Sequence, residues 1–258
     1  MRFCRSPLML FALLAAGISI TGCSAPGVAG DPAPVIADQG NNDPFEDTNR
    51  AVFHFNEELG HAVLIPAAKA YRDALPSPVR ASVHDFLQNL NGPDIFANDV
   101  LQAQGALAAH TALRTLINST VGIGGLFDPA KHLGIPYHDN DFGVTLATWG
   151  FPAGPYLVLP VLGPSNQRDF AGYVVDSFAD PGDEIAWARG YWWATIARSA
   201  VAGIDELSRN IEGLQDLEKT SLDYYATIRS LYAQRRAAQI RHENSNLPNP
   251  GAISGSGD

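Results

Sequence analysis

Proline and glycine recur at short intervals along this chain, which contains 18 Pro and 24 Gly in 258 residues. Proline has no amide hydrogen to donate inside a helix, and it biases the residue before it away from helical angles. Glycine favours turns and helix ends. The sequence therefore predicts many short elements separated by turns. Its 46% hydrophobic and 17% charged residues are typical of a globular protein.

Most of the regular patterns in the chain are helical. Asp43-Pro44-Phe45-Glu46 has the form of a capping box with proline at the first helical position, which predicts a helix start. Ile65-Pro66 and Ser77-Pro78 predict two further starts. The last of these helices is expected to end at Asn91-Gly92. Its apolar residues share one face: Val79, Val83, Phe86, Leu87 and Leu90.

Later segments extend this all-α prediction. Helices are expected at 93–103, 105–119, 165–178, 183–212 and 218–242. The only compact β-like run is 156–159, which Pro155 and Pro160 bracket. We therefore predict a single all-α domain over residues 43–243, built from many short helices that proline and glycine interrupt.

Residues 1–23 have the pattern of an export signal. Arg2 and Arg5 precede an apolar run, 8–20, that is too short to span a bilayer. The run ends at Ile20-Thr21-Gly22-Cys23, which resembles a bacterial lipobox, where the cysteine is acylated after cleavage. We interpret 1–22 as a lipoprotein signal peptide and Cys23 as the lipidated residue. A plain secretory signal with cleavage nearby is the alternative.

Polar segments flank the predicted domain. Residues 23–42 are predicted to form a flexible acylated tether, and 244–258 a disordered tail. Removing Arg2 and Arg5 from the 17 Lys and Arg leaves 15 against 27 Asp and Glu, a formal net charge of −12. That balance argues against nucleic-acid binding and against electrostatic adhesion to an anionic bilayer. Membrane attachment would then depend on acyl chains and apolar surface.

Catalytic and metal-binding motifs are scarce in the sequence. The seven His do not form a helical zinc-protease pair, and neither a Gly-x-Ser-x-Gly elbow nor a phosphate-binding loop is present. Asp139-Asn140-Asp141 begins like a calcium loop, but no closing Glu follows. Asp141 is therefore expected to cap a helix over 142–149. We predict a protein that is not an enzyme and needs no cofactor or metal.

Two further expectations concern acidic residues. Adjacent pairs such as Asp205 and Glu206 are expected at the solvated surface, because neighbours in a helix do not face each other. Were the protein a lipid-modifying enzyme, His138 and Asp141 would be its acid/base candidates.

Aromatic and uncharged segments are more informative. The phenylalanines at helical spacing, such as Phe45 and Phe86, are expected in the core. Trp187, Trp192 and Trp193 lie too close together, with Tyr191, for all to face one interior, so they are candidates for a membrane interface. Residues 149–164 carry no charge and are expected to be buried or to lie against lipid.

Residues 43–56 (DPFEDTNRAVFHFN) resemble the opening motif of the MlaA/VacJ family of outer-membrane lipoproteins. The motif positions that we single out are Asp43, Pro44, Asn49, Arg50, Phe53 and Asn56. Further blocks resemble the same family in the same order: 71–76, 89–93, 98–102, 114–128, 141–146 and 150–160, followed by Arg168-Asp169. The segment 183–220 matches no motif of the family.

The resemblance implies an all-helical ring in the periplasmic leaflet of the outer membrane, often beside a trimeric porin. Such a ring has an amphipathic channel that takes mislocalised phospholipid from the outer leaflet and passes it to a periplasmic lipid-carrier complex. We take the uncharged segment as the channel wall or gate, with these candidates: Gly150, Gly154, Pro155, Tyr156, Leu157 and Leu159. The alternative function is an envelope scaffold that binds a porin without transporting lipid.

The opening motif has two interpretations. Asn49 and Phe53 are four residues apart and share a helix face, whereas Arg50 points elsewhere. Phe53 is then either a core residue, with Arg50 in a surface ion pair, or part of a helix that separates the channel from the acyl region. On the second interpretation, deletion of Phe53 is expected to leave a folded, membrane-bound protein with altered lipid asymmetry.

Overall fold

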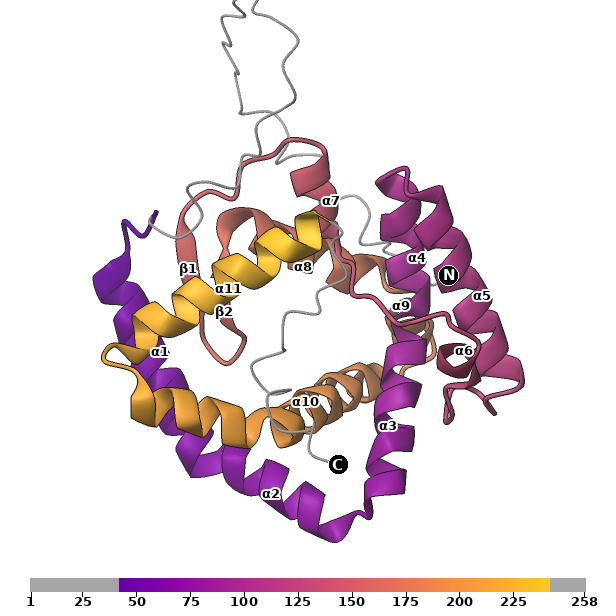
Figure 1. Cartoon of the computed structure of the whole chain (residues 1–258), viewed down its shortest axis with the longest axis horizontal. Helices are drawn as coiled ribbons and strands as arrows, with labels where there is room; N and C mark the ends of the chain where they lie inside the picture. Colours follow the sequence, from indigo (N-terminus) through magenta and orange to yellow (C-terminus); the bar gives the residue numbers. More distant parts are fainter. Residues whose placement is uncertain (1–41, 242–258) are drawn as a thin grey trace, which may run out of the picture. The chain divides into compact units, whose positions relative to one another are not determined.

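Helices follow one another in a ring in a computed structural model of the chain, which describes residues 42–241 (Figure 1). The predicted all-α class, with many short helices in a ring, is confirmed. The signal peptide 1–22, Cys23, nearly all of the tether 23–42, and the tail 244–258 lie outside the described residues, so these assignments stay predictions.

The elements have these bounds: α1 (Glu46–Leu59), the π-helix η3 (Gly60–Leu64), α2 (Ile65–Ala74), α3 (Ser77–Leu90), α4 (Gly92–Leu101), α5 (Gly105–Thr120), α6 (Pro129–His132), α7 (Phe142–Thr148), β1 (Tyr156–Leu159), β2 (Gly163–Asn166), α8 (Gln167–Ala179), α9 (Pro181–Ala188), α10 (Trp192–Thr220) and α11 (Tyr224–Ile240). The long helix α10 packs against α2, α3 and α9, while α11 contacts α7 and β2. Together these contacts close the ring.

The first helical segment corrects one prediction and confirms the start of α2 at Ile65. No capping box forms at residues 43–46: α1 begins at Glu46, and its N-cap residue makes no side-chain hydrogen bond. Pro66 lies in the first turn of α2, yet the helical backbone continues through η3 without a break. A π-helix bonds residues five apart instead of four, so η3 holds one residue more than an α-helical turn would.

Helix α3 starts and ends as predicted, but its apolar face is not a core face. None of its residues is buried, and Val79 and Phe86 are 44% and 38% exposed. The predicted helix 183–212 is in fact two helices, because Gly190 adopts a left-handed φ of +80° between α9 and α10. Helix α11 begins later than predicted, where Asp223 caps it by accepting a hydrogen bond from the Ala226 amide.

The predicted strand at Tyr156–Leu159 is confirmed as β1. It pairs in antiparallel fashion with β2, which the sequence did not indicate because Gly163–Asn166 lacks β-branched and aromatic residues. Tyr156 lies opposite Asn166, and Leu159 lies opposite Gly163. Tyr156, Val158 and Tyr225 form a small buried cluster, against which Phe53 packs.

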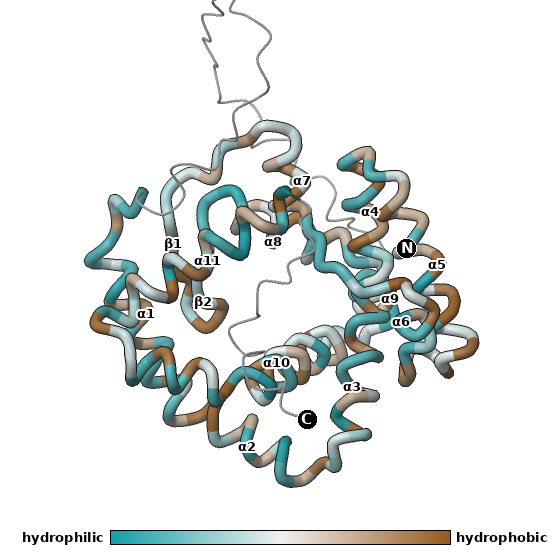
Figure 2. The backbone as a smooth tube through the Cα atoms, viewed as in Figure 1, coloured by the Kyte–Doolittle hydropathy of each residue, from teal (hydrophilic) through white to brown (hydrophobic). Residues whose placement is uncertain are grey.

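The distribution of polarity is inverted relative to a water-soluble domain. Among residues 42–241, buried polar or charged residues outnumber buried hydrophobic ones, and nearly half of the latter are alanines. Large apolar side chains are exposed on most of the helices, and hydrophobic segments recur around the ring (Figure 2). Phe45, Phe55 and Phe127 are each at least half exposed, so the expectation of a phenylalanine core is wrong for them, although Phe53 does pack against the buried cluster.

No helix within residues 42–241 combines the length and the apolar character needed to cross a membrane. Helix α10 spans 29 residues, but it is amphipathic and carries several charges along its length.

Candidate functional site

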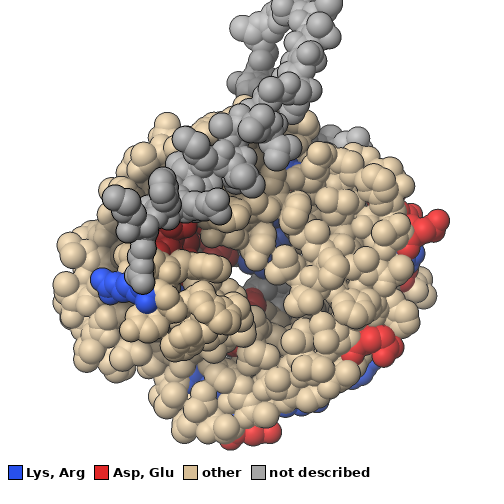
Figure 3. Space-filling view, turned by 180° about the vertical axis from the view of Figure 1, so that it is seen from behind, with Lys and Arg blue, Asp and Glu red and all other residues tan. Residues whose placement is uncertain are grey.

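A central cavity of about 870 Å³ lies between helices that are far apart in the sequence. Residues of α4, α8, α10 and α11 line it, together with the segment before α7 and the tip of the β1–β2 hairpin. Figure 3 shows a hollow in the middle of one face, with both acidic and basic surface visible inside it. The uncovered part of the face around the hollow is mostly uncharged.

Arg236 of α11 organises one wall of the cavity. Its guanidinium donates to Asp141 at 2.6 Å and to Asp169 at 2.8 Å, and also contacts Gln239. Burial, the largest single cause, would raise the pKa of Asp169, but the charge and hydrogen bond of Arg236, with smaller contributions from Arg168 and Tyr232, together hold that pKa below its usual value. The same balance lowers the pKa of Asp141.

Each carboxylate of this network also lies at the N-terminus of a helix. Asp141 accepts from the Val144 amide and caps α7, as the sequence predicted. Asp169 lies in the first turn of α8, whose cap is Asn166. Two glycines make room for the arrangement: a Cβ at Gly172 would lie 2.3 Å from the Gly143 amide nitrogen. The Arg236 ion pairs therefore hold α7, α8 and α11 at fixed positions.

A second polar network lies behind the cavity, around the fully buried Asp99 of α4. His138 Nε2 lies 3.0 Å from its Oδ1, while Thr111 and Asn140 each donate at 2.7 Å. Burial alone would raise the pKa of Asp99, but these three bonds lower it below its ordinary value. His138 thus contacts Asp99, whereas Asp141 is paired with Arg236, so the two acid/base candidates have different partners.

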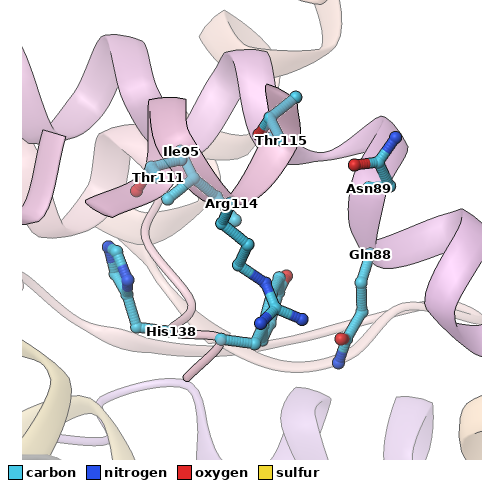
Figure 4. Close-up of a pocket in the computed structure, with 9 residues that line it drawn as sticks. Gln88, Asn89, Ile95, Thr111, Arg114, Thr115 and His138 are labelled. Carbon is cyan, nitrogen blue, oxygen red and sulfur yellow. The ribbon is translucent and has the colours of Figure 1, made fainter. Parts of the chain in front are cut away.

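Figure 4 shows a small pocket beside this network, into which Arg114 extends from α5. Its volume of about 10 Å³ holds roughly one water molecule, which is too little for a substrate. Within residues 42–241, no three His, Cys, Asp or Glu side chains are placed to hold a metal ion. The central cavity is the better candidate for a functional site.

The opening motif attaches the hairpin to α1. Asn49 donates to the Tyr156 carbonyl at 3.0 Å and accepts from the Val158 amide at 2.9 Å. Two turns later, Asn56 bonds the Leu159 carbonyl and the Val161 amide in the same way. The two asparagines thus supply hydrogen bonds to backbone groups along the edge of β1 that is not paired with β2.

The other motif residues support this clamp. Asp43 accepts from Asn49, Arg229 and Tyr225, which explains why it does not cap α1. Phe53 is partly buried, with edge contacts to Tyr225 at a centroid distance of 5.5 Å. Arg50 forms exposed ion pairs with Glu46 and Asp223, as the surface interpretation predicted. Pro44 lies in the turn before α1.

The hairpin reaches the cavity through its tip. Leu162 and Pro164 line the cavity, whereas none of the six gate candidates, all of which the structure describes, is among its lining residues. Tyr156 is buried away from it, and Leu157 and Leu159 are half-buried. Gly150 and Gly154 have φ of +89° and +71°, the left-handed angles expected of glycine there, as the chain turns toward β1 and Pro155.

The tryptophans of the interface prediction are on the surface. Trp187, Trp192 and Trp193 are 63%, 53% and 58% exposed, around the break between α9 and α10. Asp205, in contrast, is not at the surface as predicted: it is 2% exposed and bonded to His84, Arg209 and Tyr71. Its partners come from α2, α3 and its own helix. The neighbouring Glu206 in the sequence therefore could not indicate that Asp205 is buried.

Asp94 gives the cavity a pH-sensitive group. Burial, and then the charge of Asp180, raise the pKa of Asp94 to about 7, although Arg198 opposes the shift and Asp176 adds to it. Because folding raises its pKa, Asp94 makes its full contribution to the stability of the folded protein below about pH 4. This contribution is lost as the pH rises through 7.

Asp94→Asn is therefore expected to raise the melting temperature at pH 8 and to have little effect at pH 4. Because the group is partly exposed, the gain is on the order of 1–2 kcal/mol, or roughly 3–6 °C. Thermal unfolding in detergent at both pH values measures it. Asp139→Asn, which removes an equal charge from an exposed pair with Arg235, is the control and should not stabilise. Equal shifts at the two pH values would contradict the prediction.

Known proteins are similar to this sequence over most of its length. Residues 41–239 match the model of the family described as MlaA lipoprotein. A Haemophilus influenzae protein named intermembrane phospholipid transport system lipoprotein MlaA is 31% identical over 234 residues, which cover 89% of this chain and 89% of that protein. The Escherichia coli protein of that name is 29% identical over 232 residues, 88% of this chain and 87% of the relative. An uncharacterized Rickettsia felis protein is 35% identical over 209 residues, 81% of this chain and 82% of its own length.

The fold is also similar to a solved structure. Its study is named "Structural basis for maintenance of bacterial outer membrane lipid asymmetry". The two chains superpose with a TM-score of 0.69 at 29% sequence identity, over 77% of this chain and 98% of the other. The likeness therefore extends to nearly the whole of that structure.

Proposed function

This chain belongs to the MlaA lipoprotein family, and on that premise we propose that it transports phospholipid to maintain the lipid asymmetry of the outer membrane. It removes mislocalised phospholipid from the outer leaflet through the central cavity, which acts as an amphipathic channel, and passes it to a periplasmic carrier. The relatives in Haemophilus influenzae and Escherichia coli are named for intermembrane phospholipid transport.

The observation that carries this proposal is the cavity inside a ring that exposes many large apolar side chains. At about 870 Å³, the cavity is within the range of ligand sites, and both charged and apolar side chains line it. A phospholipid needs both surfaces, because its headgroup is charged and its tails are not. Transport of this kind requires no covalent chemistry, and the acid/base candidates His138 and Asp141 are engaged with Asp99 and Arg236.

Deleting the gene in its own host tests the function. Outer-leaflet phospholipid and sensitivity to detergent should both rise, and expression of the full chain should restore them. An unchanged outer leaflet in the deletion strain would falsify the transport proposal.

The protein is proposed to be anchored in the periplasmic leaflet of the outer membrane by acyl chains on Cys23. The exposed indoles of Trp187, Trp192 and Trp193 support an interface with lipid headgroups nearby. Because acyl chains supply the stable attachment, Cys23→Ala is expected to yield a folded protein that leaves the membrane fraction. Membrane fractionation with immunoblotting measures this, and Ser24→Ala is the control. Retention of the Cys23 variant would show that the apolar helix faces suffice.

A scaffold role is the second candidate, because the same exposed apolar surface could contact a trimeric porin. Purification in mild detergent separates the two functions. Phospholipid that copurifies with the protein, with or without a porin, supports transport, and a porin without phospholipid supports the scaffold. We propose a trimeric porin and a periplasmic lipid-carrier complex as partners of the transporting protein.

The hairpin between residues 149 and 164 is proposed as the gate of the channel. Its tip residues Leu162 and Pro164 line the cavity, while Asn49 binds its base and Asn56 binds the backbone next to its tip. Movement of the hairpin tip would therefore change the width of the channel without a change in the ring.

Deleting Phe53 is expected to disturb this gate while the ring folds. The deletion rotates the following residues by about 100°, which takes Asn56 off the hairpin. The π-helix η3 holds one extra residue, so its conversion to an α-helical turn restores the register of α2. We expect a membrane-bound protein with altered lipid asymmetry, measured by outer-leaflet labelling. Deletion of Ala74, which no π-turn follows, is the control and should destabilise. Degradation of the Phe53 deletion, with the phenotype of a null strain, would contradict this.

A further inference from the structure

The tip of the β1–β2 hairpin has a strained backbone. Leu159 pairs with Gly163, so Pro160, Val161 and Leu162 form the loop between the two strands. The Leu162 amide donates to the Pro160 carbonyl at 2.8 Å, which closes a three-residue turn around Val161. Val161 has a φ of +69°, so this is the rare and strained form of that turn. A β-branched residue is a genuine outlier at such an angle.

Packing does not explain why Val161 keeps this conformation. The residue is 61% exposed, so burial of its side chain does not offset the strain. Among residues 42–241, positive φ outside glycine also occurs at Ala103 and Ile123, but neither of them lines the central cavity. At the hairpin, in contrast, the next residue, Leu162, is part of the cavity wall. Strain of this kind persists only where the surroundings impose it.

Asn56 of α1 imposes the strained turn. Its side-chain nitrogen donates to the Leu159 carbonyl at 2.9 Å, and its Oδ1 accepts from the Val161 amide at 2.8 Å. These bonds fix the backbone on both sides of Pro160 against α1, while Gly163 is fixed by its pairing with Leu159. The reversal of the chain must then be completed at Val161 and the residue after it, which requires the positive φ.

A second form of the same turn is available to the hairpin tip. The inverse turn has a φ of about −75° at its central residue, keeps the bond from the third amide to the first carbonyl, and is not strained. The two forms are mirror images, so they direct the following residue to opposite sides of the hairpin. Leu162 therefore has two discrete positions, and the strained turn is the one that places it in the cavity wall.

We propose that Asn56 is a positioning residue for transport: it holds Val161 in the strained turn and so keeps Leu162 in the cavity wall. Loss of its two bonds lets the tip change to the inverse turn, which withdraws Leu162 and widens the channel. This inference rests on the proposed function, because it describes how the hairpin gate moves. The strain at Val161 and the bonds of Asn56 are of similar size and act in opposite directions, so a small change at α1 shifts the tip between its positions.

The release of a bound lipid reports the position of the tip. The full chain, purified in a neutral detergent, is loaded with a fluorescent phosphatidylethanolamine, and its dissociation rate is measured after addition of unlabelled lipid. Asn56→Ala should accelerate dissociation by up to about tenfold, since the tip leaves the cavity wall more often. Val161→Gly should slow it by a similar factor, because glycine adopts a positive φ without strain. Hydrogen exchange at the Leu162 amide should change in the same direction as dissociation in both variants.

A double variant separates positioning from simple support of the hairpin. Asn56→Ala combined with Val161→Gly should return the dissociation rate toward the wild-type value, because the strain that drives the change of turn is gone. Val161→Ala is the matched control: it removes most of the same side chain but keeps a Cβ at positive φ, so it should slow dissociation much less than glycine does. Asn49→Ala opens the base of the hairpin instead, and Val161→Gly should not rescue it.

Three results would overturn the proposal, each in a different way. Absence of rescue in the double variant would reduce Asn56 to a structural support. Equal effects of Val161→Ala and Val161→Gly would assign the change to the lost side chain rather than to the turn. Failure of the wild-type chain to bind phospholipid would remove the proposed function, and the transport role of Asn56 with it. Exchange at the Leu162 amide does not depend on lipid, so it distinguishes this last failure from a failure of the turn.

Discussion

Replacing Arg236 with leucine is expected to destabilise the protein by about 3–5 kcal/mol, the usual cost of breaking a buried ion pair by removing one partner. Asp141 and Asp169 would then be left as uncompensated charges, one of them 9% exposed. Because these carboxylates belong to the first turns of α7 and α8, the loss should loosen one wall of the cavity. Chemical unfolding in detergent micelles measures the change in the free energy of unfolding.

The adjacent Arg235 provides the control. Its ion pair with Asp139 is half exposed on both sides, so Arg235→Leu should cost at most about 1 kcal/mol. Adding Asp141→Asn and Asp169→Asn to the Arg236 variant should recover part of the loss, since it removes the unpaired charges. Similar effects of the two arginine substitutions would contradict the assigned role of Arg236.

The same variant has a characteristic pH dependence. In the wild-type protein the pKa values of Asp141 and Asp169 are lowered, so their contribution to stability is present above their unfolded value near 4 and is lost as the pH falls further. Without Arg236, burial raises these pKa values instead. The difference in stability between variant and wild type should therefore narrow as the pH falls through about 4.

Asn49→Ala is expected to cost about 2–4 kcal/mol. The substitution leaves the Val158 amide and the Tyr156 carbonyl without a partner at a site that is almost fully buried, and each such group costs roughly 1–3 kcal/mol. Hydrogen exchange at the Val158 amide should accelerate strongly, because the edge of β1 is then open to water. Unfolding experiments and amide exchange measure the two effects separately.

Asn56→Ala is the matched comparison for this site. It removes the same pair of backbone bonds from the same hairpin, but its bond with the Val161 amide is exposed, so water can replace it. We expect a loss of about 1 kcal/mol. If Asn56 proved the more important of the two, the hairpin would depend on its tip rather than on its base, contrary to the burial of Asn49.

Local signals in the sequence predicted local structure well. Asp141 caps α7 and Asn91-Gly92 ends α3, as their residue types indicate. Asp43 failed as a cap because Arg229 and Tyr225, far away in the sequence, bind its carboxylate. Propensity describes only what a residue can do with its neighbours, so a tertiary partner of this kind leaves no local sign.

The interior of the molecule could not be predicted for two reasons. Apolar periodicity marks the face that avoids water, but it does not say whether protein or lipid covers that face, so Val79 and Phe86 were assigned to a core. The buried charges are also separated widely along the chain: Arg236 lies 95 residues from Asp141 and 67 from Asp169. Only the colinear family blocks pointed to a ring with a channel.

The inverted distribution of polarity also affects the heat capacity of the protein. Unfolding of a water-soluble domain exposes apolar area, and this exposure produces most of the positive heat-capacity change. Here many large apolar side chains, such as Leu116 and Trp187, are already outside, while buried groups such as Asp99 and Arg236 are polar. Exposure of polar groups lowers the heat capacity. The stability of this ring should therefore vary less steeply with temperature than that of a soluble domain of equal length, with a flatter maximum and weaker cold destabilisation.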